Sequence, residues 1–237
     1  MRIGKLDIRW ADLVGILCRL IANTAWRRVA FFLLPYACLL VGMDVAAHYA
    51  IATGFRLPDQ MLLSEDGGFG EWLEYSLTAA TCVMLALLWR WRGSLAYLAN
   101  AVLFAWMTID NALQFHERSG AIIGPYLEGL PLPASAEHVG EALFVVGIGL
   151  LWLVGLAASL WRGQLAPALH SLVLAGCVAG TAVFGVVVDL FSNDIVGNPY
   201  YQELAIFIED GGEFAMIIVS FLVALAIFDC ERKADSA

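Results

Sequence analysis

The stretch that decides the fold is Glu209-Asp210-Gly211-Gly212-Glu213, followed by the apolar run FAMIIVSFLVALAIF over residues 214–228. The same phrase stands earlier as Glu137-His138-Val139-Gly140-Glu141 and, with two residues inserted, as EDGGFGE over residues 65–71. Each copy places carboxylates at the start of an apolar segment. A phrase that recurs at long, similar spacing is typical of tandem structural repeats.

A second motif recurs on the other side of each phrase. The preceding apolar segment ends in Asp with a polar residue four positions later, as in Asp44/His48, Asp110/Gln114 and Asp189/Asn193. Trp91-Arg92-Gly93 is echoed by Trp161-Arg162-Gly163. These repeats predict three tandem helical hairpins in one bundle with pseudo-threefold character.

Composition places the chain in a membrane. Hydrophobic residues make up 61% of it, and the mean hydropathy is +0.77. A helix needs about 20 apolar residues to cross a bilayer, and its backbone groups must be satisfied within the segment. Six runs meet this requirement, so we expect an all-α integral membrane protein with spans near residues 29–50, 71–89, 94–115, 139–161, 167–191 and 204–228.

Basic residues predict the orientation. Of the thirteen Lys and Arg residues, eleven fall before the first span, in the two short turns or after the last span. Only Arg56 and Arg118 fall on the other side. This positive-inside bias predicts cytoplasmic termini, in an inner membrane of bacterial type. The net charge of −9 then faces outward and argues against nucleic acid as a partner.

The domain organisation is simple. Residues 1–28 are expected to form a cytoplasmic amphipathic segment, with a short helix at the membrane surface over residues 8–27. Residues 29–228 form the six-helix domain, and residues 229–237 form a cytoplasmic tail. None of the five cysteines lies in an outer loop or in a C-x-x-C motif, which argues against a disulfide framework.

The repeated aspartates need an energetic explanation. Asp44, Asp110 and Asp189 lie near the C-terminal ends of their predicted helices, where the helix dipole disfavours an anion. A charged Asp within the membrane costs about 2.5–3.5 kcal/mol on insertion scales. A metal, a basic partner, a proton or hydrogen bonds must offset this cost. Function is the default interpretation of such residues.

The repeated glutamates have a simpler explanation. Glu71, Glu141 and Glu213 are expected in the first turns of their helices, where the helix dipole stabilises an acid by up to about 1 kcal/mol. Glu74 lies one turn deeper. A hydrogen-bonded set of neutral acids and amides that holds the hairpins together is therefore an alternative to a functional site.

The histidines favour a metal site. His48, His116 and His138 are all predicted at the acidic face, and sets of His, Asp and Glu bind Zn²⁺, Mn²⁺ or Fe, whereas all-oxygen sets favour Ca²⁺ or Mg²⁺. We expect a divalent cation, without distinguishing among these metals. The first-choice ligands are Asp110, His116, Glu137, His138 and Glu141. The acidic crown is completed by Asp44, His48, Glu71, Glu74, Asp189, Glu209 and Glu213.

Three functions fit this pattern. The leading hypothesis is an outward-facing cation site, and in an enzyme Glu71 or Glu141 would act as base for a metal-activated water that attacks a lipid or a periplasmic small molecule. The second is a cation or proton transporter. The third is a non-catalytic subunit or assembly factor of a larger membrane complex.

Overall fold

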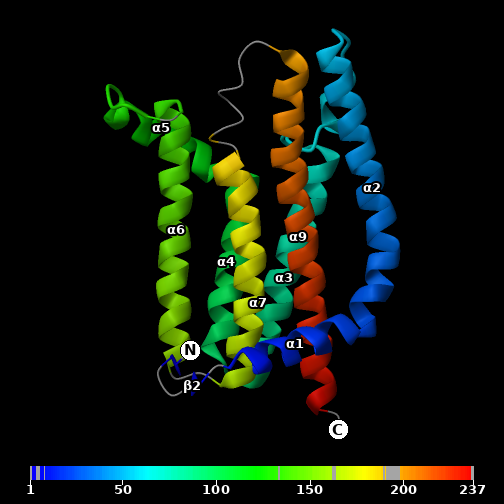
Figure 1. The fold of residues 1–237 in the computed structure, drawn as a ribbon, viewed down its shortest axis with the longest axis vertical. Helices are drawn as coiled ribbons and strands as arrows, with labels where there is room; N and C mark the ends of the chain where they lie inside the picture. The colour runs from blue at the N-terminus through cyan, green and yellow to red at the C-terminus, as the bar shows by residue number, and fades with distance from the viewer. Residues whose placement is uncertain are drawn as a thin grey trace.

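The computed structural model describes residues 2–3, 6–7, 9–132, 134–161, 164–188, 190 and 198–235, which are largely helical (Figure 1). A pair of two-residue strands, β1 (Arg2–Ile3) and β2 (Leu6–Asp7), comes first. The remaining elements are α1 (Trp10–Ala22), α2 (Thr24–Ala52), η1 (Asp59–Met61), α3 (Phe69–Arg92), α4 (Leu95–Leu113), α5 (Phe115–Leu127), α6 (Ala136–Trp161), α7 (Leu165–Ala182), the π-helical η2 (Val183–Val188) and α9 (Pro199–Asp235).

Five helical segments are long and apolar enough to cross a membrane: α2, α3, α6, α7 together with η2, and α9. The prediction of an all-helical membrane protein is confirmed at this level. The remaining predicted span, the third at residues 94–115, corresponds to α4, which has 19 residues and carries Asn100, Asp110 and Asn111. These polar residues lower the hydropathy of α4, and its status as a span is not confirmed. It nevertheless packs inside the bundle, against α3, α6 and α7.

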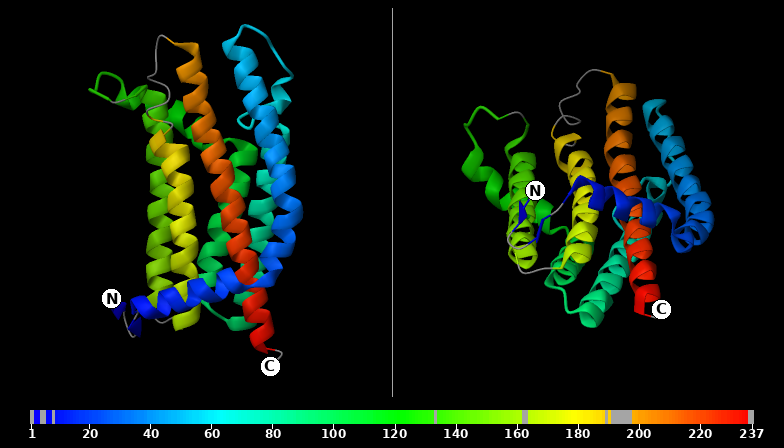
Figure 2. Two further views of the ribbon diagram at one scale, coloured as in Figure 1. Left: turned by 45° about the vertical axis from the view of Figure 1, so that its right-hand side comes forward. Right: turned by 60° about the horizontal axis from the view of Figure 1, so that its bottom comes forward.

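The long helices run roughly along one axis, and α9 packs against several of them (Figures 1 and 2). α9 contacts α2, α3 and α7, and the pairs α3–α4 and α5–α6 are the most extensive contacts. α3 and α4, which correspond to the second and third predicted spans, pack side by side. The threefold arrangement of hairpins is not confirmed, because α2 packs mainly on α9 rather than on α3.

The two ends of the bundle differ in their elements. α1 lies across the helices at the end where α9 finishes, and we call this the terminal end (Figure 2). The opposite end holds the start of α3, the start of α6 and α5, and we call it the acidic end (Figure 1). The prediction of a helix within residues 8–27 is confirmed by α1.

Apolar packing is densest toward the terminal end. Leu85 and Leu88 of α3, Phe104 of α4, Leu174 of α7 and Ile227 of α9 are almost completely buried in one cluster. A second cluster joins α2, α3 and α9. Within a membrane, such contacts stabilise the bundle by close van der Waals packing, because lipid tails are as apolar as these side chains. The terminal half is therefore a solid core.

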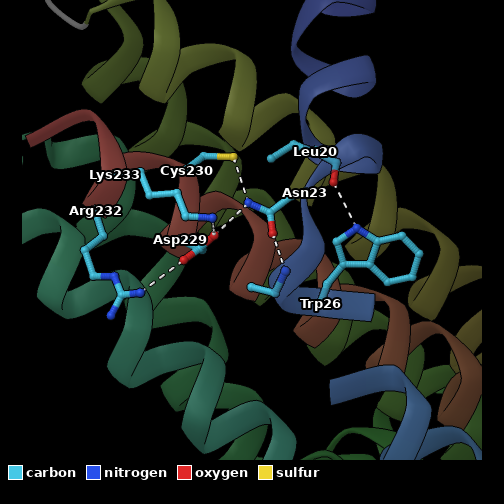
Figure 3. Close-up of polar contacts among 8 residues, drawn as sticks. Leu20, Asn23, Trp26, Asp229, Cys230, Arg232 and Lys233 are labelled. Carbon is cyan, nitrogen blue, oxygen red and sulfur yellow. Dashed lines mark hydrogen bonds and ion pairs between the residues drawn. The ribbon is translucent and has the colours of Figure 1, made fainter. Parts of the chain in front are cut away.

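A polar junction ties α1 to this core (Figure 3). Asn23 ends α1 and caps α2, because its side-chain oxygen accepts the Ala25 N–H at 2.7 Å. Its amide nitrogen donates to Asp229 Oδ2 at 2.9 Å. Arg232 and Lys233 neutralise Asp229. The junction fixes the angle at which the chain leaves α1 and enters the membrane helix.

Two boundaries differ from the sequence expectation. α9 begins at Pro199, so Glu213 lies well inside a helix rather than in its first turn, and the helix-dipole explanation does not apply to it. The connection over residues 116–138 contains the helix α5, which lies against α6. Gly120 and Gly124 of α5 permit this contact, because both lie against the backbone of Glu137.

Candidate functional site

A cavity of about 620 Å³ lies between α3, α4, α6, α7 with η2, and α9. One part of it is apolar, and the other part lies toward the acidic end. The described lining residues include seven acids, one histidine and no Lys or Arg; the acids are Asp66, Glu71, Glu74, Asp110, Glu117, Asp210 and Glu213. Binding pockets for small molecules commonly have volumes of about 300–1,000 Å³ and combine apolar walls with a few polar groups.

Two helices each contribute a pair of acids to this lining. Glu71 and Glu74 are three residues apart on α3, and Asp210 and Glu213 are three residues apart on α9. This spacing places both members of a pair on one helical face. The α3 and α9 helices pack against each other, so the two pairs meet, and Glu74 has Glu213, Asp210 and Glu71 as its charged neighbours.

A third group comes from the junction of α4 and α5. Gln114 adopts a left-handed conformation with φ of 52°, which ends α4 and turns the chain back on itself. The His116 N–H then donates to Asp110 Oδ1 at 3.0 Å, and His116 Nδ1 lies 3.1 Å from Asp110 Oδ2. The hydrogen bond to Asp110 is the main reason why the pKa of His116 is raised above its usual value. Glu117 and Glu141 add to this effect.

A fourth group lies beside the cavity on α2. Asp44 is completely buried, and its Oδ1 accepts the Leu63 N–H at 2.9 Å. His48 Nε2 lies 3.4 Å from Asp44 Oδ1, and His48 Nδ1 lies 2.7 Å from Glu203 Oε2. Asp210 connects this group electrostatically to the cavity, since Asp44 and His48 are both among its charged neighbours.

Asp44 and Asp110 therefore have the same kinds of stabilising contact. Each accepts a backbone N–H from the segment that follows its helix, and each lies beside a histidine. Hydrogen bonds to the charged form favour it. These contacts offset part of the cost of a charged Asp in the membrane, although Asp44 Oδ2 is buried without a hydrogen-bond partner in the described structure. The third member of the set, Asp189, lies outside the described residues, as does Asn193.

The glycine of each repeated phrase is required for close packing. A Cβ on Gly70 would lie 2.5 Å from Leu63 Cδ2, and one on Gly140 would lie 3.1 Å from the Gly120 oxygen. A Cβ on Gly212 would lie 2.2 Å from the Phe184 ring. Steric closeness, rather than an entry turn, is the shared reason for these glycines.

The structure separates the first-choice ligands into two places. Asp110 and His116 lie together, and Glu141 is among the charged neighbours of His116. Glu137 is exposed on α6 and does not line the cavity. The His138 Nδ1 atom lies 2.6 Å from Ser135 Oγ, which also accepts the His138 N–H. His138 thus belongs to the start of α6.

Among the other members of the predicted crown, Glu71, Glu74 and Glu213 line the cavity, whereas Asp44, His48 and Glu209 do not. Within the described residues, no group of three or more His, Cys, Asp or Glu side chains is arranged to hold one metal ion. The carboxylates surround a space instead of converging on a point.

Four residues of this region were absent from the predicted site. Asp66, Glu117 and Asp210 line the cavity, and Glu203 contacts His48. Asp210 carried a detectable signal, because Asp210-x-x-Glu213 repeats the spacing of Glu71-x-x-Glu74. Glu203 carried none, since residues 192–203 were assigned to a loop.

Comparison with other proteins identifies a family for this chain but indicates no activity. Neither the search of curated proteins nor the search of solved structures found a match. A family described as a domain of unknown function (DUF8692) matches residues 37–228. This range includes all the cavity-lining residues. The chain belongs to the DUF8692 family.

Proposed function

We propose that this membrane protein binds a cation at the acidic part of its cavity. The observation that carries the proposal is the charge of the lining: seven acids and no Lys or Arg among the described residues. Carboxylates that share a poorly solvated site cannot all remain ionised without compensation. A bound cation supplies that compensation, and shared protons supply it when the cation is absent.

The donor chemistry narrows the cation. Carboxylate oxygens dominate the lining, and His116 is the only histidine among the described lining residues. Such oxygen-rich sites suit Ca²⁺, Mg²⁺ or Mn²⁺ better than Zn²⁺. The dispersed arrangement of the acids suits a cation that keeps its water shell, or one that is itself large. In the enzymatic form of the proposal, a bound cation would supply Lewis-acid activation of water, and Glu71 in the cavity lining or Glu141 beside His116 would be the base.

The positive-inside bias supports an acidic end that faces outward, with both termini in the cytoplasm of a bacterial type of cell. The proposal retains six spans with α4 as the third. It also attributes the repeated sequence pattern to a threefold structural repeat. The matching environments of Asp44 and Asp110 support this interpretation.

Transport of the cation or of protons is the second candidate, and a buried polar network at the terminal end favours it. Tyr97 Oη lies 2.8 Å from His170 Nδ1, and His170 lies 3.7 Å from Glu231. The apolar cluster around Leu85 and Phe104 separates this network from the cavity. A transport cycle would have to open that cluster.

Cation binding is tested on full-length protein in nanodiscs of neutral lipid. We expect Ca²⁺, Mg²⁺, Mn²⁺ or tetramethylammonium to raise the thermal unfolding midpoint, because a ligand at 100 times its Kd stabilises the folded state by about 2.7 kcal/mol. The double variant Glu74→Gln/Asp210→Asn should lose this response.

The matched control is Glu137→Gln, which removes an exposed acid at the same end of the molecule. It should respond to cations as the wild type does. A wild-type protein that no cation stabilises, or a Glu137→Gln variant that alone loses the response, would disprove the cavity as the binding site.

A further inference from the structure

We propose that the natural ligand is an amphiphilic organic cation, with its charged head among the acids and its apolar part between α6 and α7. This inference rests on the proposed function and names its substrate class. It also implies that the ligand reaches the cavity from the bilayer.

The apolar part of the cavity carries the first step. Leu103 and Met107 of α4, Val146 and Leu150 of α6, and Val178 of α7 line it. All of these residues lie on the same side of the acids along the helix axes, toward the middle of the membrane helices. An inorganic ion gains nothing from such a surface, whereas a hydrocarbon chain packs against it.

The packing of α6 provides the route. α6 contacts α4 and α5, while α7 contacts α4 and α9, and the cavity lies between α6 and α7. Val146, Leu150 and Leu153 line the cavity and are also about half exposed, at 48%, 57% and 47%. α6 and α7 make no extensive contact with each other among the described helices, so these side chains lie at an open seam between the two helices. The apolar part of the cavity is therefore continuous with the hydrocarbon region.

The acidic part suits a large organic head group. No three described metal-ligating side chains converge on one point, yet Asp210 Oδ2 is buried without a hydrogen-bond partner in the described structure. Trp106 lines the cavity one helical turn from Asp110, and its ring stacks on Phe115 with centroids 5.6 Å apart. Ammonium groups bind favourably to indole faces, and a fixed Trp beside carboxylates forms such a surface.

A glycine in the apolar wall makes the proposal testable. Gly149 of α6 lines the cavity, and a Cβ built there meets no atom within 4 Å. Gly149→Leu should therefore fill part of the apolar space without displacing backbone. Gly147 is the matched control, because it is on the same helix with the same open surroundings but is not among the lining residues.

The experiment uses full-length protein in nanodiscs of neutral lipid, with radiolabelled dodecyltrimethylammonium as probe. Unlabelled dodecyltrimethylammonium, tetramethylammonium, dodecanol and Mn²⁺ serve as competitors. We expect Gly149→Leu to weaken binding of the probe about tenfold, equivalent to about 1.4 kcal/mol. The same variant should bind tetramethylammonium within about twofold of the wild type, since the head-group site is intact. Gly147→Leu should match the wild type for both.

The outcomes separate the two proposals. If tetramethylammonium or Mn²⁺ binds through Glu74 and Asp210, but Gly149→Leu leaves probe affinity unchanged, the amphiphile is disproved and cation binding stands. Displacement of the probe by dodecanol as effectively as by its charged analogue also overturns the amphiphilic cation. If no cation binds, both proposals fail. Should Gly149→Leu not fold, Ala179→Leu fills the same space from α7 and carries the same expectations.

Discussion

The two ends of α9 carry the same kinds of side chain in opposite surroundings. At the terminal end, Asp229 lies between Asn23, Arg232 and Lys233 (Figure 3). Glu231, also at this end, lies 2.7 Å from Arg92. At the acidic end, Asp210 and Glu213 face other acids across a cavity. The carboxylates at the terminal end are therefore paired with basic side chains of the same chain. No Lys or Arg is among the described residues that line the cavity at the acidic end, so in the proposal above protons or a bound cation compensate these acids.

The largest expected effect comes from breaking the pairing at the terminal end. Arg92→Met removes the ion pair with the Glu231 carboxylate. It also removes the hydrogen bond that Arg92 donates to the Glu231 backbone carbonyl oxygen at 2.6 Å. The remaining carboxylate is largely buried, so the variant should lose about 3 kcal/mol of unfolding free energy. Thermal or denaturant unfolding of the purified protein measures this loss.

Arg90→Met is the control for that experiment. Arg90 is on the same helix, two residues earlier, and is exposed. It should cost less than about 0.5 kcal/mol, as expected for a surface residue. Equal losses in the two variants would show that the Arg92–Glu231 pair has no special importance.

A smaller effect tests the packing of the repeated phrase. Gly212→Ala places a Cβ within 2.5 Å of three atoms of the Phe184 ring, whereas Gly211→Ala meets nothing closer than 3.6 Å. We expect Gly212→Ala to cost about 1–3 kcal/mol through overpacking. Gly211→Ala should instead stabilise the helix by up to about 1 kcal/mol.

The same unfolding measurement compares these two adjacent variants. Their opposite signs are the discriminating feature, since an effect of helix propensity alone would stabilise both. Parallel stabilisation would mean that the α9–η2 contact is looser than the structure indicates.

Replacing one acid by its amide at each end should change the free energy of unfolding in opposite directions. Glu74→Gln replaces an acid that is crowded by other acids with a neutral group, so in the absence of added cation it should stabilise the protein by about 1 kcal/mol. Glu231→Gln removes a paired charge from the terminal end and should destabilise it.

Unfolding in a chelator at fixed pH measures both variants. A destabilised Glu74→Gln protein would indicate that Glu74 is held by specific partners instead of repelled by its neighbours. In that case the carboxylates form a structural network, which was the alternative considered from the sequence.

Much of the fold could be read from the sequence, because apolar runs of membrane-spanning length correspond directly to helices. The core of α2, α3, α6, α7 and α9 was placed in this way. The start of α9 was not, since the pair Gly211-Gly212 resembles a helix boundary but continues the helix, supported by packing on Phe184. Helix α5 was missed because its glycines suggest a loop, although they permit contact with α6.

The candidate site was predictable as a set of acids but not as a set of partners. Glu71, Glu74 and Glu213 stood out by position, and the structure places them in one cavity. Which acid meets which depends on helix packing that sequence spacing does not encode. His138 illustrates the limit: its spacing to Glu141 resembled a ligand pair, but its ring binds Ser135 at the start of the helix.

The smallest expected effect is a pH dependence at the acidic end. The pKa of His116 is raised in the folded protein, chiefly by its hydrogen bond to Asp110. Protonated His116 therefore adds stability that is complete below the usual His pKa of about 6.5 and is lost as the pH rises through the higher folded value. The His116 side chain is 31% exposed, so this contribution is on the order of 1 kcal/mol.

The variant His116→Asn lacks this contribution at every pH. The difference in unfolding free energy between wild type and variant should shrink as the pH rises above the usual His pKa of about 6.5. A pH-independent difference for His116→Asn would mean that the Asp110–His116 contact is made by a neutral ring, and that a single histidine cannot provide the positive charge that the acidic end lacks.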